Sequence, residues 1–190
     1  VYVDDLLVIG PTAADVKAAK AVVLGHFKAR DMGEPEWFLG MHIIRDRAAG
    51  TITLSQRQYA TTLVERYGMG DANRTTLPMP VGSRLRREGA ALEGANNAAY
   101  PEMIGALLYL ATSTRPDIAY AVARLARYTT SPTEEHRALL KGVLRYVKGT
   151  QNWGLTYGRD APLTGYTDAD FAGDLDTRRS TTGFVFTLNG

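Results

Sequence analysis

The chain has 190 residues, of which 45% are hydrophobic, so it is long and apolar enough to fold around its own core. Its formal net charge of +2 does not by itself indicate a polyanionic partner. The absence of cysteine excludes disulfides and thiolate zinc sites, and because no apolar run has transmembrane length or a signal-peptide layout, we expect a soluble intracellular protein without a membrane partner.

Two short apolar runs, residues 1–3 and 6–9, open the chain and meet at Asp4 and Asp5. This pattern predicts a tight β-hairpin with both acids at its tip. Adjacent carboxylates repel each other, so such a pair is tolerated in a solvated turn or where a divalent cation neutralises it. The dipeptide alone favours an ordinary turn.

Apolar residues at helical spacing next predict an amphipathic helix over residues 13–30, packed beneath the Asp4-Asp5 turn. Two β-rich runs, 37–45 and 51–54, predict a second hairpin, and a helix follows over 57–67. These elements complete a first predicted unit, which we place at residues 1–70.

Residues 71–99 contain few large apolar side chains and many of Gly, Pro, Asn, Ser and Arg, which predicts a long, partly mobile linker. Arg84, Arg86 and Arg87 form the densest basic cluster of a chain in which 17 of the 22 basic residues are arginine. The planar guanidinium group of arginine can donate two parallel hydrogen bonds to a phosphate group, so this cluster could contact a nucleic-acid backbone. A compositional bias of the source genome explains the excess equally well, and we favour a solvated linker for this cluster.

Residues 100–150 have a helical pattern. One helix is predicted over 100–113, and a second opens at Pro116-Asp117. The sequence Ser131-Pro132-Thr133-Glu134 predicts a capping box at the start of a third helix that ends at Gly149. His136 lies in the first turn of that helix, where we expect a surface or packing role.

The last stretch, residues 151–190, is β-rich, with strands predicted over 153–157, 163–167 and 183–188. A sheet of this kind needs helices to cover it. We therefore expect 151–190 to be the opening of a domain that is truncated at Gly190.

Five motifs resemble one family. Tyr2-Val3-Asp4-Asp5 followed by an apolar run resembles the metal motif in the palm of reverse transcriptases, and the following sequence is similar to the polymerase of copia-type long-terminal-repeat retrotransposons. The other matching segments are 38–43 with 51–56, 105–111 with 114–119, 144–150, and 168–174 with 178–184. They occur in the family's order.

The resemblance implies an α+β fold that joins three parts. Residues 1–70 would be the end of the palm, with a primer-grip hairpin, and the start of the thumb, followed by the linker 71–99. Residues 100–150 would be a helical thumb and connection region, and 151–190 the first strands of a ribonuclease H-like domain.

The same resemblance implies two incomplete Mg²⁺ sites. Asp4 and Asp5 would be two of the three catalytic carboxylates of the polymerase, and Asp168 the first acid of the ribonuclease H cluster, while the role of Asp170 stays open. Acids of segment 168–179 also suggest a calcium loop, but Arg179 stands where the bidentate Glu belongs, so this alternative is rejected.

Template and primer contacts are implied for Tyr2, Trp37, Phe38, Leu39 and Gly40. From the residues alone, Tyr2 is simply a strand aromatic, Phe38 is expected in the core, and Trp37 stays open.

The implied function is a fragment of an RNA-directed DNA polymerase with ribonuclease H from a retrotransposon Pol polyprotein. Its partners would be RNA or DNA template-primer, dNTPs and the remainder of Pol, in the family within cytoplasmic virus-like particles. Without the third palm acid, the fingers and most of ribonuclease H, we expect no activity from the chain alone. A non-catalytic nucleic-acid-binding or decayed remnant, and an unrelated metal-dependent phosphotransferase using Asp4 and Asp5, are the alternatives.

Overall fold

The computed structural model describes residues 1–158 and 162–188, apart from the side chain of Ala95. Parts of the predicted segment 151–190 therefore lie outside the described residues. The chain divides into two compact units, Val1–Pro35 and Glu36–Gly190. Helices and antiparallel strands occur together, which confirms the α+β class. None of the helices that the structure describes is both long and apolar enough to cross a membrane.

The first unit contains one helix, α1 (Ala13–His26). The Thr12 hydroxyl accepts a hydrogen bond from the Asp15 backbone at 3.2 Å and caps the helix, which explains where it begins. The helix ends at His26, four residues before the predicted end. We expected this helix to bury an apolar face beneath the Asp4-Asp5 turn, but none of its side chains is buried.

A four-stranded antiparallel sheet opens the second unit. Its strands, in spatial order, are β1 (Trp37–Phe38), β2 (Met41–Asp46), β3 (Thr51–Ser55) and β4 (Gly154–Tyr157). The pairing of β2 with β3 confirms the predicted second hairpin, but the predicted strand over 37–45 is divided at residues 39–40 into β1 and β2, which pair with each other.

The position of β4 differs from the prediction, because the structure pairs it with β3 and not with the strands that follow it. A Cβ on Gly154 would lie 2.3 Å from the Leu54 carbonyl oxygen, so only glycine allows this close approach. The hydroxyls of Thr53 and Thr156 are 2.8 Å apart across the pair. Contacts between residues a hundred positions apart thus decide where the strand lies.

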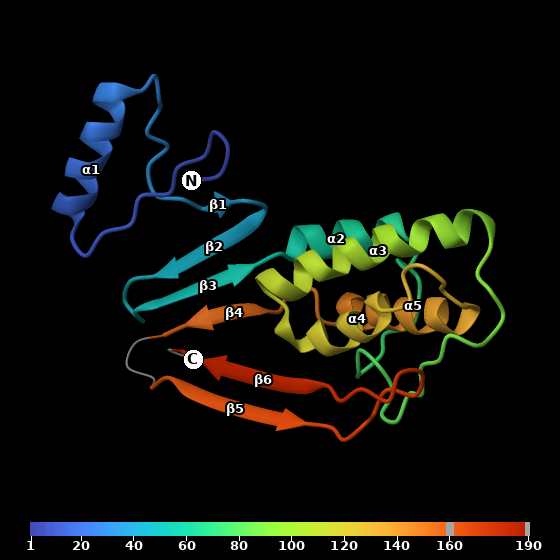
Figure 1. Ribbon diagram of the computed structural model, residues 1–190. Helices are drawn as coiled ribbons and strands as arrows, with labels where there is room; N and C mark the ends of the chain where they lie inside the picture. The colour runs from blue at the N-terminus through green and yellow to red at the C-terminus, as the bar shows by residue number, and fades with distance from the viewer. Residues whose placement is uncertain (159–161, 189–190) are drawn as a thin grey trace. The chain divides into compact units, whose positions relative to one another are not determined.

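Helices pack into a layer that contains the main core (Figure 1). They are α2 (Arg57–Arg66), α3 (Gly94–Ser113), the short 3-10 helix η1 (Pro116–Ile118), α4 (Ala119–Ala126) and α5 (Glu134–Gly149). Fully buried side chains from these helices include Leu107, Leu110, Ile118, Val122, Leu125, Leu140, Val143 and Leu144. The predicted helix over 100–113 begins six residues earlier, at Gly94, and includes Pro101 in its interior, where proline has no N–H to donate to the carbonyl four residues earlier.

The predicted linker 71–99 is irregular up to Glu93 but packs against the helices. Leu85 and Leu92 are buried in the core, and the Leu92 backbone N–H donates to the Pro132 carbonyl at 2.9 Å. Two isolated leucines make no periodic pattern, so this packing could not be predicted from the residues alone.

The start of α5 differs by two residues from the predicted capping box, because Thr133 and not Ser131 is the N-cap. The His136 ring nitrogen Nδ1 accepts the Thr133 backbone N–H at 3.0 Å, which completes the capping box. His136 is fully buried and stacks on Tyr128, with ring centroids 3.9 Å apart. Its predicted packing role is confirmed.

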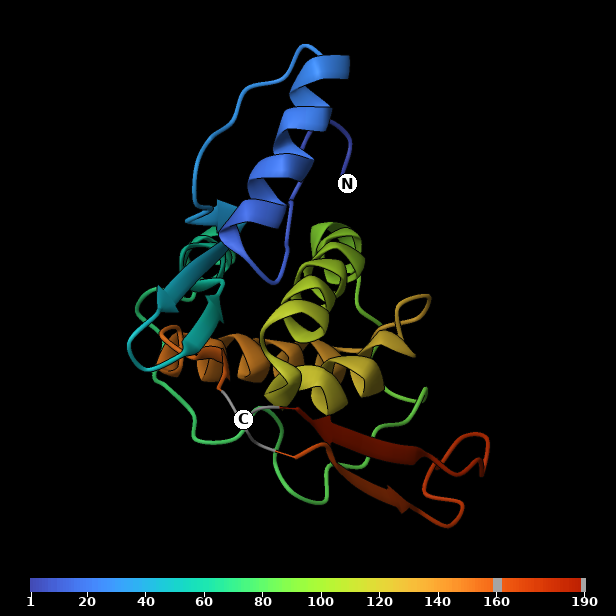
Figure 2. The ribbon, with the colours of Figure 1, turned by 90° about the vertical axis from the view of Figure 1, so that its left-hand side faces the viewer.

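The last two strands, β5 (Thr164–Ala169) and β6 (Thr182–Thr187), form a separate antiparallel pair. Helices α4 and α5 lie between this pair and the helices α2 and α3 (Figures 1 and 2). The strand pair confirms the two predicted strands in this part of the chain.

Candidate functional site

The Asp4-Asp5 turn is tighter than predicted. Tyr2 and Asp5 exchange both backbone hydrogen bonds, each 2.8 Å long, so Val3 and Asp4 form the tip and Asp5 lies beside it. Val3 has a positive φ of 47°, as a two-residue turn of this kind requires. The predicted tip of two acids is therefore wrong by one residue, and in place of the predicted strands over 1–3 and 6–9 the structure has only the isolated bridge between Tyr2 and Asp5.

Both carboxylates suit a hard divalent cation. Asp4 and Asp5 are exposed, and neither side chain has a hydrogen-bond or ion-pair partner within the described part of the chain. Such oxygen donors fit Mg²⁺, which retains several waters and accepts one or two carboxylates. No group of three acidic or histidine side chains gathers among the described residues.

A second candidate feature is the turn between β1 and β2. Leu39 and Gly40 both have positive φ, at 49° and 72°, which is the geometry of a type I′ hairpin turn. The Tyr109 hydroxyl, from α3, donates to the Leu39 carbonyl at 2.5 Å. A helix seventy residues away thus supports a turn that contains a left-handed leucine, and no local sequence signal marks Tyr109 for this role.

Beside this turn, an aromatic side chain borders a hollow of about 470 Å³. Trp37 is half exposed and stacks on His42 across the β1–β2 pair, with centroids 4.6 Å apart. The hollow is lined by Trp37, His42, Arg57, Gln58, Thr61, Thr62 and Glu65. Phe38 is only partly buried and so is not the core residue that was predicted. A flat ring beside a guanidinium and amide can contact a base, a sugar or a phosphate.

The third candidate acid, Asp168, lies on β5 opposite Gly183. It is exposed, and its carboxylate accepts the backbone N–H of Ala169 at 2.9 Å. Asp170 is used differently, since its carboxylate accepts backbone N–H groups of Thr181 at 2.7 Å and Gly173 at 3.4 Å. Asp170 therefore closes the loop between β5 and β6, while Asp168 keeps an accessible carboxylate.

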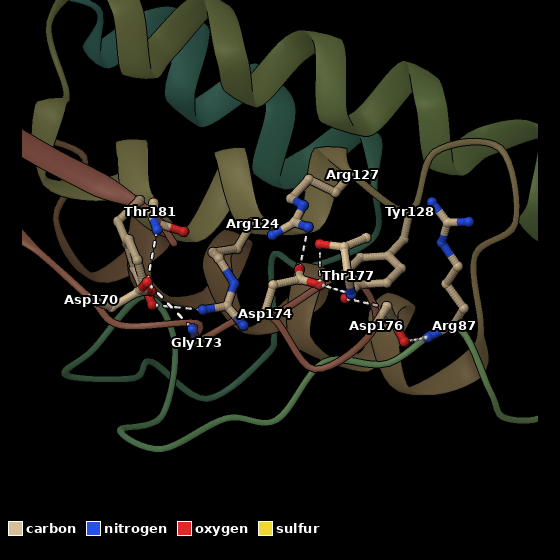
Figure 3. A network of polar contacts seen from close by, with 11 residues as sticks. Arg87, Arg124, Arg127, Tyr128, Asp170, Gly173, Asp174, Asp176, Thr177 and Thr181 are labelled. Atoms are coloured by element: carbon tan, nitrogen blue, oxygen red, sulfur yellow. Dashed lines mark hydrogen bonds and ion pairs between the residues drawn. The ribbon is translucent and has the colours of Figure 1, made fainter. Parts of the chain in front are cut away.

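Two further acids hold this loop to the end of α4 (Figure 3). Asp174 is buried and forms an ion pair with Arg127. Asp176 accepts the Tyr128 hydroxyl and the Arg87 backbone N–H, each at 3.2 Å. We call the segment 170–181 the acidic loop.

The charge state of Asp174 follows from these contacts. Burial alone would raise its pKa, but hydrogen bonds from Thr177 and the positive charge of Arg127 outweigh burial and lower the pKa from 3.8 to about 2. The backbone N–H and hydroxyl of Thr177 donate to the carboxylate at 2.5 and 2.8 Å. Three of the acids considered for a calcium loop, Asp170, Asp174 and Asp176, are thus engaged within the protein.

Comparison with known proteins places these features in a family. Residues 1–81 match the family described as reverse transcriptase (RNA-dependent DNA polymerase). Over its whole length the chain is 37% identical to the retrovirus-related Pol polyprotein from transposon TNT 1-94 of Nicotiana tabacum. It is also 39% identical to the retrovirus-related Pol polyprotein from transposon RE1 of Arabidopsis thaliana, in a match that covers 99% of the chain. It spans only 15% and 13% of the length of these relatives.

A shorter relative is matched over most of its length. An uncharacterized mitochondrial protein of Arabidopsis thaliana is 36% identical over 96% of this chain, and the match covers 75% of that protein. No solved structure matches the chain. From these matches and the motifs described above, the chain belongs to the copia-type retrotransposon Pol family and contains its reverse transcriptase-like region.

Proposed function

We propose that the chain contributes to an RNA-directed DNA polymerase with ribonuclease H, acting as part of a larger Pol polyprotein on an RNA or DNA template-primer and dNTPs. The observation that carries the proposal is the tight turn that presents Asp4 and Asp5 without partners within the described chain, in the segment that matches the reverse transcriptase family. The proposed parts are the end of the palm and start of the thumb (1–70), a connecting segment (71–99), a helical thumb region (100–150) and the start of ribonuclease H (151–190).

At the polymerase site, Asp4 and Asp5 would hold Mg²⁺ together with a third acid from another part of Pol. When bound, the metal would supply activation of the primer hydroxyl and charge stabilisation at the leaving pyrophosphate. The role of this chain is to fix the two carboxylates on a turn closed by a pair of backbone hydrogen bonds.

The primer end would be positioned by Tyr2, Trp37, Phe38, Leu39 and Gly40. The exposed ring of Trp37 offers a flat surface, and the Leu39-Gly40 turn is held by Tyr109. A rigid turn supports catalysis because alignment of the reacting groups lowers the entropic part of the barrier.

Asp168 is the proposed first acid of the ribonuclease H site, where it would share Mg²⁺ with acids from elsewhere in Pol. Its exposed carboxylate supports this role. Asp170, which closes the acidic loop, is not proposed as a ligand.

Substitution in an intact Pol polyprotein carrying this chain tests the proposal. We expect D4N to lower primer extension at least about 100-fold while leaving RNA cleavage of a preformed hybrid in place, and D168N to do the reverse. D71N, an exposed acid outside both sites, is the matched control.

The 190-residue chain alone should extend no primer with Mg²⁺ or Mn²⁺. Full extension by the D4N polyprotein, or extension by the chain alone that D4N abolishes, would contradict the proposal.

A further inference from the structure

Two arginine-rich loops that are far apart in sequence meet at the end of α4. The backbone N–H of Arg87 donates to Asp176 of the acidic loop at 3.2 Å, so the segment 84–87 lies against the segment 176–179. Arg84, Arg86, Arg87, Arg178 and Arg179 are therefore brought to one region of the second unit. We call these five residues the arginine surface.

The acids in this region offset the charge of the arginine surface only in part, since Asp170, Asp176 and the neighbouring Glu88 carry three negative charges against its five positive ones. Asp174 pairs with Arg127, Asp170 accepts backbone N–H groups, and Asp176 accepts the hydrogen bonds from Tyr128 and the Arg87 backbone. All five side chains of the arginine surface are exposed, and none has an ion-pair partner within the described residues. Gathering like charges in this way raises the local positive potential.

A hollow of about 500 Å³ borders the arginine surface. Arg84 lines it from one loop, Leu175 from the acidic loop, and Tyr120 with Arg124 from α4. Tyr120 is 61% exposed, and the Arg124 guanidinium lies 5.7 Å from its ring centroid and donates to its hydroxyl at 2.9 Å. Proteins that bind nucleic acid combine such groups: the guanidinium groups contact phosphates, and an exposed aromatic ring stacks on a base.

We propose that the arginine surface binds the phosphate backbone of single-stranded nucleic acid. Its residues are distinct from the acids and the β1–β2 turn assigned to the polymerase. An acidic polypeptide would also be attracted by the charge, but it would make no use of the exposed ring of Tyr120.

The test compares two variants of the full chain that lose the same charge. R84Q/R87Q/R179Q removes three members of the arginine surface, and K17Q/K28Q/R30Q removes three exposed cations of the first unit. Binding of a fluorescein-labelled oligothymidylate of about 20 nucleotides, enough to span a single-strand site, is measured by anisotropy over a series of salt concentrations. Circular dichroism checks that each variant is folded.

We expect R84Q/R87Q/R179Q to bind at least about tenfold more weakly and to lower the slope of log affinity against log salt by about 2, since each phosphate that the protein neutralises on a single strand contributes about 0.7 to that slope. The K17Q/K28Q/R30Q control should stay within about threefold of the unmodified chain. Y120A should weaken binding about fivefold or more because it removes the stacking surface.

Equal weakening by the two triple variants, no binding by the unmodified chain, or displacement of the oligonucleotide by polyglutamate as readily as by unlabelled oligothymidylate would each overturn the proposal. The assay requires no polymerisation, so its outcome is separate from that of primer extension.

Discussion

Asp174 illustrates how a residue that looks like a metal ligand can serve the fold. Its side chain is 2% exposed, and it accepts two hydrogen bonds from Thr177 beside the Arg127 guanidinium. A buried carboxylate is stable only when its charge is balanced in this way. We infer that Asp174 anchors the acidic loop to the end of α4.

D174N should therefore lower the free energy of unfolding by about 1–3 kcal/mol at pH 7, because the substitution removes the negative charge that pairs with the Arg127 guanidinium. Urea denaturation measures this decrease, with D71N as the exposed control.

The effect of D174N should also depend on pH. Because the folded-state pKa of Asp174 is lowered to about 2 from 3.8, its ionised form stabilises the fold above about pH 4, and this stabilisation disappears as the pH falls toward 2. The difference between the unmodified chain and D174N should shrink over that range. A difference that is the same at about pH 7 and about pH 2.5 would contradict the assigned role.

At the scale of elements, the start of α5 depends on a buried histidine. Nδ1 of His136 accepts the Thr133 N–H, while Nε2 is buried without a hydrogen-bond partner among the described groups. Burial lowers the pKa of His136, although the nearby charges of Glu135 and Asp176 act in the opposite direction. The fold therefore favours the neutral imidazole, which is the form that can accept at Nδ1.

We expect the unfolding free energy to decrease as the pH falls from about 7.5 to about 5, since the unfolded chain takes up a proton that the folded His136 resists. H136Q keeps a side-chain acceptor at the third position of the capping box but cannot be protonated in this range, so its pH dependence should be weaker. Urea denaturation at both pH values is the measurement, with H26Q, at the exposed end of α1, as the control. An unchanged pH dependence in H136Q would exclude His136 as its source.

For the whole molecule, the core belongs to the second unit. Buried hydrophobic side chains run from Ala60 to Val147, and no residue of Val1–Pro35 is buried. The pairing of β3 with β4 also links an early segment of the second unit to a late one.

The polypeptide 36–190 should thus unfold cooperatively with a midpoint within about 2 °C of that of the full chain, because it keeps every buried residue that the structure describes. Thermal unfolding followed by circular dichroism tests this. A midpoint lower by about 10 °C or more would show that the first unit stabilises the second.

Local chemistry made much of the fold predictable. The β2–β3 hairpin, the helix over 57–66 and the two strands β5 and β6, though not their pairing, follow from apolar periodicity and turn residues within a few positions of one another. Five motifs in the family's order, the first of them around Asp4 and Asp5, together indicated the family, which the comparisons confirmed. The exact tip of its turn was not predictable, because a left-handed Val3 goes against the usual preference of valine.

The sequence by itself determined most of the elements and the family, since each element and each of the five motifs is encoded by residues close together in the chain. Only the tertiary structure decided that β4 completes the first sheet, that Tyr109 supports the Leu39-Gly40 turn, and that the 84–87 segment meets the acidic loop. Each of these contacts joins residues at least seventy positions apart. Their formation depends on burial and hydrogen bonding in the folded chain, for which no local pattern exists.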